Sequence, residues 1–164
     1  GLESTDDPGI LTAFGKLAMS RGQWSEARGW VERALLAAPT DTTVKLNLGI
    51  IAMAEGKLAE ARVLLEQSVT GNPASFDGWN ALGSVYARQG DPKGAVTAWQ
   101  RAHELDPGVL DVVYNLGLAS AQAGRTSQAV GYLEDYAARA QPGEQRERAL
   151  AIAQRLRQQA AQSR

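Results

Sequence analysis

The sequence predicts an all-α fold in which pairs of helices repeat and stack as a solenoid. The first observation is a period of 34 residues shared by four ladders of identical residues. The ladders are Pro39, Pro73 and Pro107; Gly15, Gly49, Gly83 and Gly117; Gly22, Gly56, Gly90 and Gly124; and Ala27, Ala61, Ala95 and Ala129. A fixed period of this length is typical of stacked supersecondary units. The second observation is that apolar residues recur at helical spacing inside each period.

The repeats divide the chain into three parts. Residues 1–7 are polar and acidic, and we expect them to form a flexible N-terminal segment. Four repeats then span residues 8–41, 42–75, 76–109 and 110–143. Residues 144–164 leave the pattern, and we expect a capping helix followed by a short tail.

Each repeat contains signals for two helices. In the second repeat Val44, Leu48 and Ile51 share one face of a first helix of about 14 residues. The glycine ladder that begins at Gly22 ends these first helices, because glycine adopts the left-handed conformation of a helix C-cap. The second helices stop before the prolines, since proline disfavours helix in the residue before it. Acidic residues at helix boundaries, such as Asp41 and Asp91, are explained as caps.

Small residues inside the helices indicate close packing. Gly49 and its equivalents lie mid-helix, where glycine costs about 1 kcal/mol relative to alanine. Four such glycines imply that the two helices of each repeat approach closely, with the alanine ladder opposite. Large residues precede these glycines, and we expect them to fill the adjoining space. They are Phe14, Leu48, Leu82 and Leu116.

The last helix has a thin apolar stripe and a basic surface. From residue 139 onward six arginines stand against two glutamates. A polar-faced helix that covers the end of a solenoid explains this composition. Contact with RNA or an anionic membrane is the alternative, but no aromatic residues are interleaved as single-strand binding favours.

Composition limits the possible classes of function. The 164 residues fit one domain, the net charge is -1, and cysteine is absent. This net charge indicates no global basic surface for nucleic acid. The sequence also contains no run of 18 apolar residues, the length needed to span a membrane. The chain starts without methionine or signal peptide, so we expect an excised domain or processed product, and its localisation is not determined.

No constellation of catalytic residues is found in the sequence. His103 is the one histidine, and without cysteine it has no partners for a metal site or a nucleophile–base pair. We interpret it as a packing or capping residue. The glycines follow the repeat and form no phosphate-binding loop. We therefore expect no enzyme activity, no metal and no cofactor.

One tryptophan is predicted to lie partly on the surface. Trp30 precedes the inward-facing Val31, so its ring should point outward on the convex side of the first repeat. Two readings stay open: packing against the N-terminal segment, or a contact to a preceding domain or a second copy.

The third repeat resembles a complete tetratricopeptide repeat (TPR). Its signature residues are Trp79, Leu82, Gly83, Tyr86, Gly90, Ala95, Trp99, Ala102 and Pro107. All four repeats match at the small and apolar positions, so the resemblance covers about residues 8–143. It implies a right-handed α-solenoid of four helix pairs, and it implies a protein or peptide partner bound in a concave groove lined by the first helices.

The resemblance also implies which residues line the groove. They are Thr12, Lys16, Met19, Leu46, Asn47, Ile50, Met53, Asn80, Ser84, Arg88, Tyr114, Asn115 and Leu118. We expect the apolar members to anchor a partner. We expect the asparagines to hold its backbone, since an amide both donates and accepts, although a structural hydrogen bond within the repeat is equally compatible with each asparagine.

A subclass of TPR domains holds a terminal carboxylate with a clamp of lysine, asparagine and arginine, and this chain departs from it. Of the corresponding positions Thr12, Lys16, Asn47, Asp77 and Ala81, only Asn47 matches. We therefore predict a non-catalytic interaction scaffold, monomeric or weakly homo-oligomeric, with no nucleic-acid partner. The alternative is an oligomerisation or docking module of a larger, possibly enzymatic protein, which would use the convex face or the solenoid ends.

Overall fold

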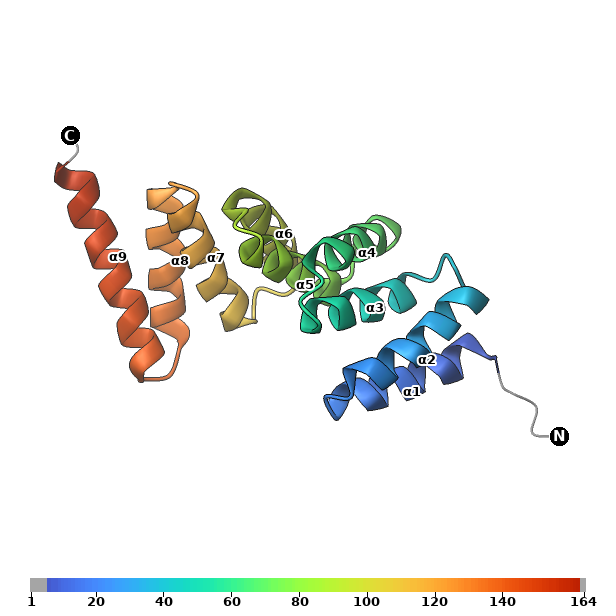
Figure 1. The fold of residues 1–164 in the computed structure, drawn as a ribbon. Helices are drawn as coiled ribbons and strands as arrows, with labels where there is room; N and C mark the ends of the chain where they lie inside the picture. Colours follow the sequence, from blue (N-terminus) through green and yellow to red (C-terminus); the bar gives the residue numbers. More distant parts are fainter. Residues whose placement is uncertain (1–5, 163–164) are drawn as a thin grey trace. The chain divides into compact units, whose positions relative to one another are not determined.

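The computed structural model describes residues 6–162, and within this range the chain is built from helices alone. Nine α-helices follow one another in the described residues (Figure 1). They are α1 (Pro8–Ser20), α2 (Trp24–Ala37), α3 (Thr42–Ala54), α4 (Leu58–Gly71), α5 (Phe76–Arg88), α6 (Pro92–Leu105), α7 (Leu110–Gln122), α8 (Thr126–Arg139) and α9 (Glu144–Gln162). The prediction of an all-α fold made of helix pairs plus one further helix is confirmed.

Two compact units divide the chain, Gly1–Val85 and Tyr86–Arg164, with the boundary inside α5. Most of the flexible segment predicted for residues 1–7, and the last two residues of the tail, lie outside the described residues. None of the helices in residues 6–162 combines the length and the apolar character needed to cross a membrane.

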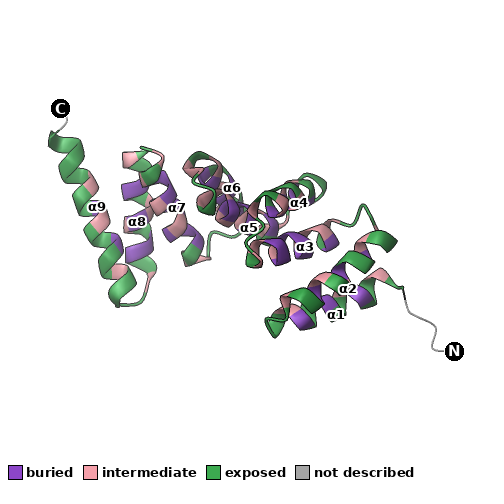
Figure 2. Ribbon diagram, in the orientation of Figure 1, coloured by how far each residue is buried: buried purple, intermediate pink, exposed green. Residues whose placement is uncertain are grey.

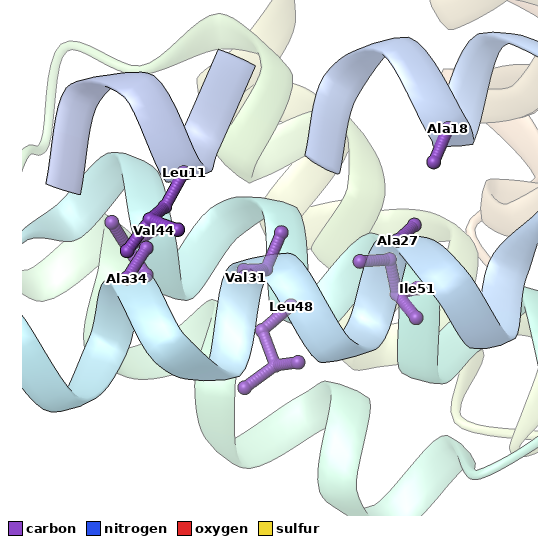
Figure 3. Close-up of a cluster of buried hydrophobic side chains, with 8 residues drawn as sticks. All are labelled: Leu11, Ala18, Ala27, Val31, Ala34, Val44, Leu48 and Ile51. Atoms are coloured by element: carbon purple, nitrogen blue, oxygen red, sulfur yellow. The ribbon is translucent and has the colours of Figure 1, made fainter. Parts of the chain in front are cut away.

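The core of the first unit lies between neighbouring helices. Val31 and Ala34 of α2 pack in one cluster with residues of α1 and α3, and their side chains are fully buried. The labelled side chains of Figure 3 converge from these three helices. The cluster consists of Leu11, Ala18, Ala27, Val31, Ala34, Val44, Leu48 and Ile51. One set of α2 side chains thereby joins two consecutive repeats.

The predicted helix boundaries have the expected local chemistry. The carboxylate of Asp41 accepts hydrogen bonds from the backbone N–H groups of Thr43 and Val44, at 2.7 and 3.1 Å. Asp91 likewise accepts from the N–H of Gly94 at 2.9 Å. Each first helix is followed by a glycine with a positive φ between 70° and 78°, as predicted. A side chain would be strained in this conformation, so the glycines fix the turn between paired helices.

Removing the cap at Asp41 is expected to weaken α3. The Asp41→Ala variant leaves two backbone N–H groups without their acceptor and should lower the free energy of unfolding by about 1 kcal/mol. Asp41→Asn keeps an accepting oxygen and serves as the control, with little loss expected. Urea denaturation followed by circular dichroism measures both. A loss in the asparagine variant equal to that in the alanine variant would contradict the capping role.

Close approach at the mid-helix glycines is present in both units. A Cβ added at Gly49 would lie 2.7 Å from Cγ of Leu65. The equivalent atom at Gly117 would lie 2.7 Å from Cγ of Leu133. Both leucines are fully buried and cannot move away easily. The glycine ladder is therefore explained by helix contact, as predicted.

The first and last helices differ in the side chains that they expose, and Figure 2 shows α9 exposed over most of its length. Helix α9 buries Ala149 and Ala153 against α8, and most of its remaining surface is polar and exposed. Phe14 of α1, by contrast, is 47% exposed, whereas Leu48, Leu82 and Leu116 are at most 4% exposed. The expectation that Phe14 fills a space like its equivalents is wrong, because no helix precedes α1 in the described residues.

Candidate peptide-binding face

Seven predicted contact residues of the first unit lie on α1 and α3. Leu46, Ile50 and Met53 follow one another at helical spacing, so they share one side of α3. Their side chains are only partly buried. We call this set the α3 row. The equivalent positions of α1 hold Thr12, Lys16 and Met19, of which Lys16 is exposed and the other two are partly buried. The α3 row is thus apolar surface that the first unit leaves accessible.

Asn47 does not share this exposure. Its side chain is 4% exposed, and its Nδ2 has no hydrogen-bond partner among the described residues. The expectation of an exposed Asn47 in the groove is wrong. One residue further along a helix turns the side chain by about 100°, so Asn47 points away from the α3 row. The burial of Asn47 contradicts an exposed peptide contact, and its Nδ2 makes no structural hydrogen bond with a described residue.

Helix α5 contributes Asn80 and Ser84 to the first unit. Both are partly buried. The hydroxyl of Ser84 donates to the backbone carbonyl of Asn80 at 3.1 Å, within the helix. That bond uses the single donor of Ser84 and leaves its lone pairs as acceptors. Ser84 can therefore accept a hydrogen bond from a partner without losing its own.

In the second unit the predicted residues have different environments. Tyr114 is 7% exposed and belongs to a buried cluster, with its ring centroid 5.0 Å from that of Tyr136. The expectation that Tyr114 is exposed is wrong, because its ring packs on Tyr136 instead of facing solvent. Asn115 and Leu118 are partly buried, and Arg88 is exposed.

Sequence analysis missed an ion-pair network in the first unit. The Arg28 guanidinium of α2 donates to the carboxylates of Glu55, Glu60 and Glu32, with shortest distances of 2.7, 2.8 and 3.1 Å. Lys57 adds a fourth contact, 2.9 Å from Glu55. Hydrogen bonds from Arg28 and then Lys57 lower the pKa of Glu55 to about 2. The charges of these residues follow no ladder, so the period carried no signal for them.

Trp30 has a partner in α1. Its ring stacks on Phe14 with a centroid separation of 5.1 Å, and the Arg33 guanidinium lies 5.2 Å over the same ring. Arg33 also pairs with Asp6 at 2.9 Å. The partly outward position predicted for Trp30 is found, and its contact is to the first helix.

His103 lies in a setting that fits packing. It is partly buried, and its ring meets Tyr132 edge-on at 6.2 Å. Its Nδ1 has no partner within the described range. Residues 6–162 contain no group of three or more histidine, cysteine, aspartate or glutamate side chains that could hold a metal ion.

A comparison with protein families decides the classification. The model described as tetratricopeptide repeat matches residues 12–76, 46–109 and 80–145, which together include most of the chain. The chain belongs to the tetratricopeptide repeat family. Among curated proteins, the TPR chain is 37% identical over 62 residues to peroxisome biogenesis protein 5 of Arabidopsis thaliana. That match covers 38% of the chain and 8% of the relative's length.

Solved structures confirm the TPR fold. A crystal structure of MamA protein matches with a TM-score of 0.80 and 23% identity, over 94% of this chain and 86% of the other. YrrB, described as a TPR protein with an unusual peptide-binding site, matches with a TM-score of 0.76 and 22% identity, over 82% and 69%. The first TPR of Spaghetti, bound to an HSP90 peptide, matches at 0.69 and 18% identity, over 76% and 99%. At these identities the likeness shows the fold alone.

Proposed function

We propose that this TPR chain is a non-catalytic scaffold that binds an extended or helical segment of a partner protein on the face of its first helices. Family membership supports the general role in protein interaction. Of the structural relatives, YrrB is described as having an unusual peptide-binding site, and the first TPR of Spaghetti is bound to an HSP90 peptide. The finer assignment rests on this chain's own residues.

The α3 row is the observation that carries the proposal. Leu46, Ile50 and Met53 present three apolar side chains that the first unit leaves partly exposed. Burying such a row against a partner is favourable at about 25 cal/mol per Å² of apolar surface. A methionine adapts its shape to different partners. An apolar segment at helical or extended spacing is the ligand that fits this row.

Polar residues on either side of the α3 row supply orientation. Lys16 of α1 offers an exposed cation, and Ser84 of α5 offers acceptor lone pairs. A partner with an acidic residue beside its apolar anchors suits Lys16. The exposed Asp77 in the first turn of α5 opposes a terminal carboxylate at the position where a carboxylate clamp would need a cation. The segment is therefore recognised internally, along its length, and not by its C-terminus.

In the second unit, the partly buried Leu118 and Asn115 contact the partner, and Arg88 offers an exposed cation. Tyr114 contributes through the core by holding α7 against α8 and not by direct contact. The Tyr114→Ala change would leave a cavity beside Tyr136 and confuse binding with stability. Tests of binding should therefore use partly exposed positions.

A peptide-display selection on the purified chain tests the α3 row. We expect the selected peptides to share apolar residues at recurring spacing and to lose at least about tenfold in affinity on the Ile50→Asp variant, because a carboxylate buried in the contact loses its hydration. Affinities are measured by fluorescence anisotropy with labelled peptides. Circular dichroism at the same temperature establishes that the variant is folded.

The matched control for this test is Leu36→Asp. Leu36 lies on α2 and is 83% exposed, so the same chemical change there leaves the α3 row intact. Equal affinity of the selected peptides for Ile50→Asp and for the unchanged chain would rule out the α3 row as the contact surface. Loss of affinity on Leu36→Asp alone would move the site to the second helices.

A further inference from the structure

The outer side of α1 carries an apolar stripe that the other described residues leave partly exposed. Ile10, Phe14 and Leu17 are 43, 47 and 47% exposed and lie at helical spacing on one side of the helix. The residues 34 positions later are Val44, Leu48 and Ile51, and these are at most 4% exposed. The same positions of the repeat are therefore buried in α3 and open in α1.

The structure shows what kind of element covers these positions elsewhere. Val44, Leu48 and Ile51 of α3 share a buried cluster with Val31 and Ala34 of the preceding α2 (Figure 3). In the second unit Val112 and Leu116 of α7 are fully buried, and α6 packs against this helix. In both units the cover is an amphipathic helix that precedes the first helix of the pair. The surface of α1 repeats this interface, and no helix precedes α1 within residues 6–162 to cover it.

Charge distinguishes the uncovered site from its covered equivalent. At the covered site, Arg28 of α2 reaches Glu55, the C-cap residue of α3, at 2.7 Å. The residue at the same position of the first repeat is Arg21, the C-cap of α1. Arg21 is exposed and makes no side-chain hydrogen bond or ion pair with any described residue. The sign of the charge at this position is reversed.

A complementary helix must therefore offer a carboxylate where α2 offers Arg28. The first repeat also keeps one negative charge near this position, because Glu26 corresponds to Glu60 of the second repeat. Of the two Arg28 partners in the second repeat, however, the side chain of Glu60 is 39% exposed and that of Glu55 only 16%. Residue 21 is the position of the tighter and less exposed contact, so Arg21 dominates the preference.

This chain's own second helices do not meet the requirement. The residues equivalent to Arg28 are Arg62, Val96 and Val130, none of which is acidic. The exposed surface of α9 carries Arg148 and Arg155 beyond the two glutamates of its first turn, Glu144 and Glu147. A second helix from another copy, packed in the register of α2, would bring arginine or valine to Arg21 and not a carboxylate. The second helices of this chain are therefore not the complement of Arg21, which favours an acidic helix of other sequence.

We propose that Ile10, Phe14, Leu17 and Arg21 form a docking site for an acidic amphipathic helix of a partner protein. The helix packs on α1 as α2 packs on α3, with apolar residues on the stripe and a carboxylate on Arg21. This site is separate from the α3 row. The scaffold thereby holds two partners, one on the first-helix face and one at the outer side of its first repeat.

Two synthetic peptides test the site directly. One carries residues 23–38 of this chain, the sequence of α2 with its flanks, and the other carries the same residues with Arg28→Glu. Isolated helices of this length are marginal in water, so both contain the same side-chain staple at the positions of Gly29 and Arg33. Each is titrated into the intact chain, and amide NMR shifts of residues 8–21 are followed.

We expect the Arg28→Glu peptide to shift the α1 amides and to bind about two- to fivefold more tightly than the unchanged peptide, as an exposed ion pair allows. The Arg21→Glu variant of the chain should reverse this preference. Leu17→Asp should abolish binding of both peptides, and Ile50→Asp in the α3 row should leave it unchanged. Thermal unfolding establishes that the variants are folded.

Three results would overturn the proposal. The first is the absence of shifts in α1 with either peptide. The second is that the two peptides bind with equal affinity, both to the unchanged chain and to the Arg21→Glu variant. That result would show that the site does not select an acidic helix. The third is a dimeric mass of the chain alone by light scattering that becomes monomeric on Leu17→Asp, which assigns the stripe to a second copy.

Discussion

Replacing Gly49 with alanine is expected to lower the free energy of unfolding by about 2 kcal/mol, although alanine is the better helix former. The new Cβ would lie 2.7 Å from Cγ and 2.8 Å from Cδ2 of Leu65, and 3.5 Å from the carbonyl oxygen of Ala61. Leu65 is fully buried, so α3 and α4 must separate or Leu65 must leave its rotamer. Both responses cost more than the helix propensity gains.

Gly29 provides the matched control. It is also mid-helix, but a Cβ added there meets no atom within 4 Å. Gly29→Ala should therefore raise the free energy of unfolding by about 0.5–1 kcal/mol through helix propensity alone. Urea denaturation of the two variants measures the difference in sign. Stabilisation by Gly49→Ala would show that the helices can separate freely and that the glycine ladder does not serve close packing.

The second large effect is a loss of stability in acid that depends on Glu55. Its pKa of about 2 in the folded chain lies below the ordinary value of 4.5, because Arg28 and then Lys57 donate hydrogen bonds to the ionised carboxylate. A depressed pKa means that the unfolded chain binds the proton more readily. The stabilisation is fully present above about pH 4.5 and is lost as the pH falls toward 2.

Neutralising Glu55 should remove this pH dependence. Because the network is only partly buried, we expect Glu55→Gln to lower the free energy of unfolding at pH 7 on the order of 2 kcal/mol. The difference from the unchanged chain should shrink steadily between pH 4.5 and pH 2. Glu32→Gln is the control, since Glu32 is exposed and contacts Arg28 at its longest distance of 3.1 Å. Urea denaturation across this pH range measures both variants, and parallel pH profiles for the unchanged chain and Glu55→Gln would contradict the assignment.

The fold could be predicted because the sequence repeats it. Gly22 and its equivalents, Gly49 and its equivalents, and the proline ladder each report a local requirement that recurs at one spacing. Three or four copies of each requirement at one spacing separate it from chance. The positive φ of the loop glycines and the contact at Gly49 are the physical reasons for the pattern.

The candidate site was less predictable because it depends on exposure, which the period does not determine. Tyr114 and Leu46 hold equivalent positions, yet Tyr114 is buried against Tyr136 and Leu46 remains partly exposed. Size decides the outcome, since a tyrosine ring reaches the neighbouring helix. Phe14 shows the opposite case, where a core position is exposed because no helix precedes it in the described part of the chain. The repeat pattern alone predicts neither the contact of Tyr114 with Tyr136 nor the exposure of Phe14.

The composition of the Arg28 network bears on how the array comes apart. Repeat proteins unfold as a chain of units whose contacts with neighbours have separate strengths. Ion pairs join the first repeat to the second, whereas the residues equivalent to Arg28 are Arg62 in the second repeat and the valines Val96 and Val130 in the third and fourth. Salt and acid weaken charge contacts and leave apolar burial largely intact. In such media the contact between the first and second repeats therefore weakens, and hydrogen exchange would register the local opening in α1 and α2.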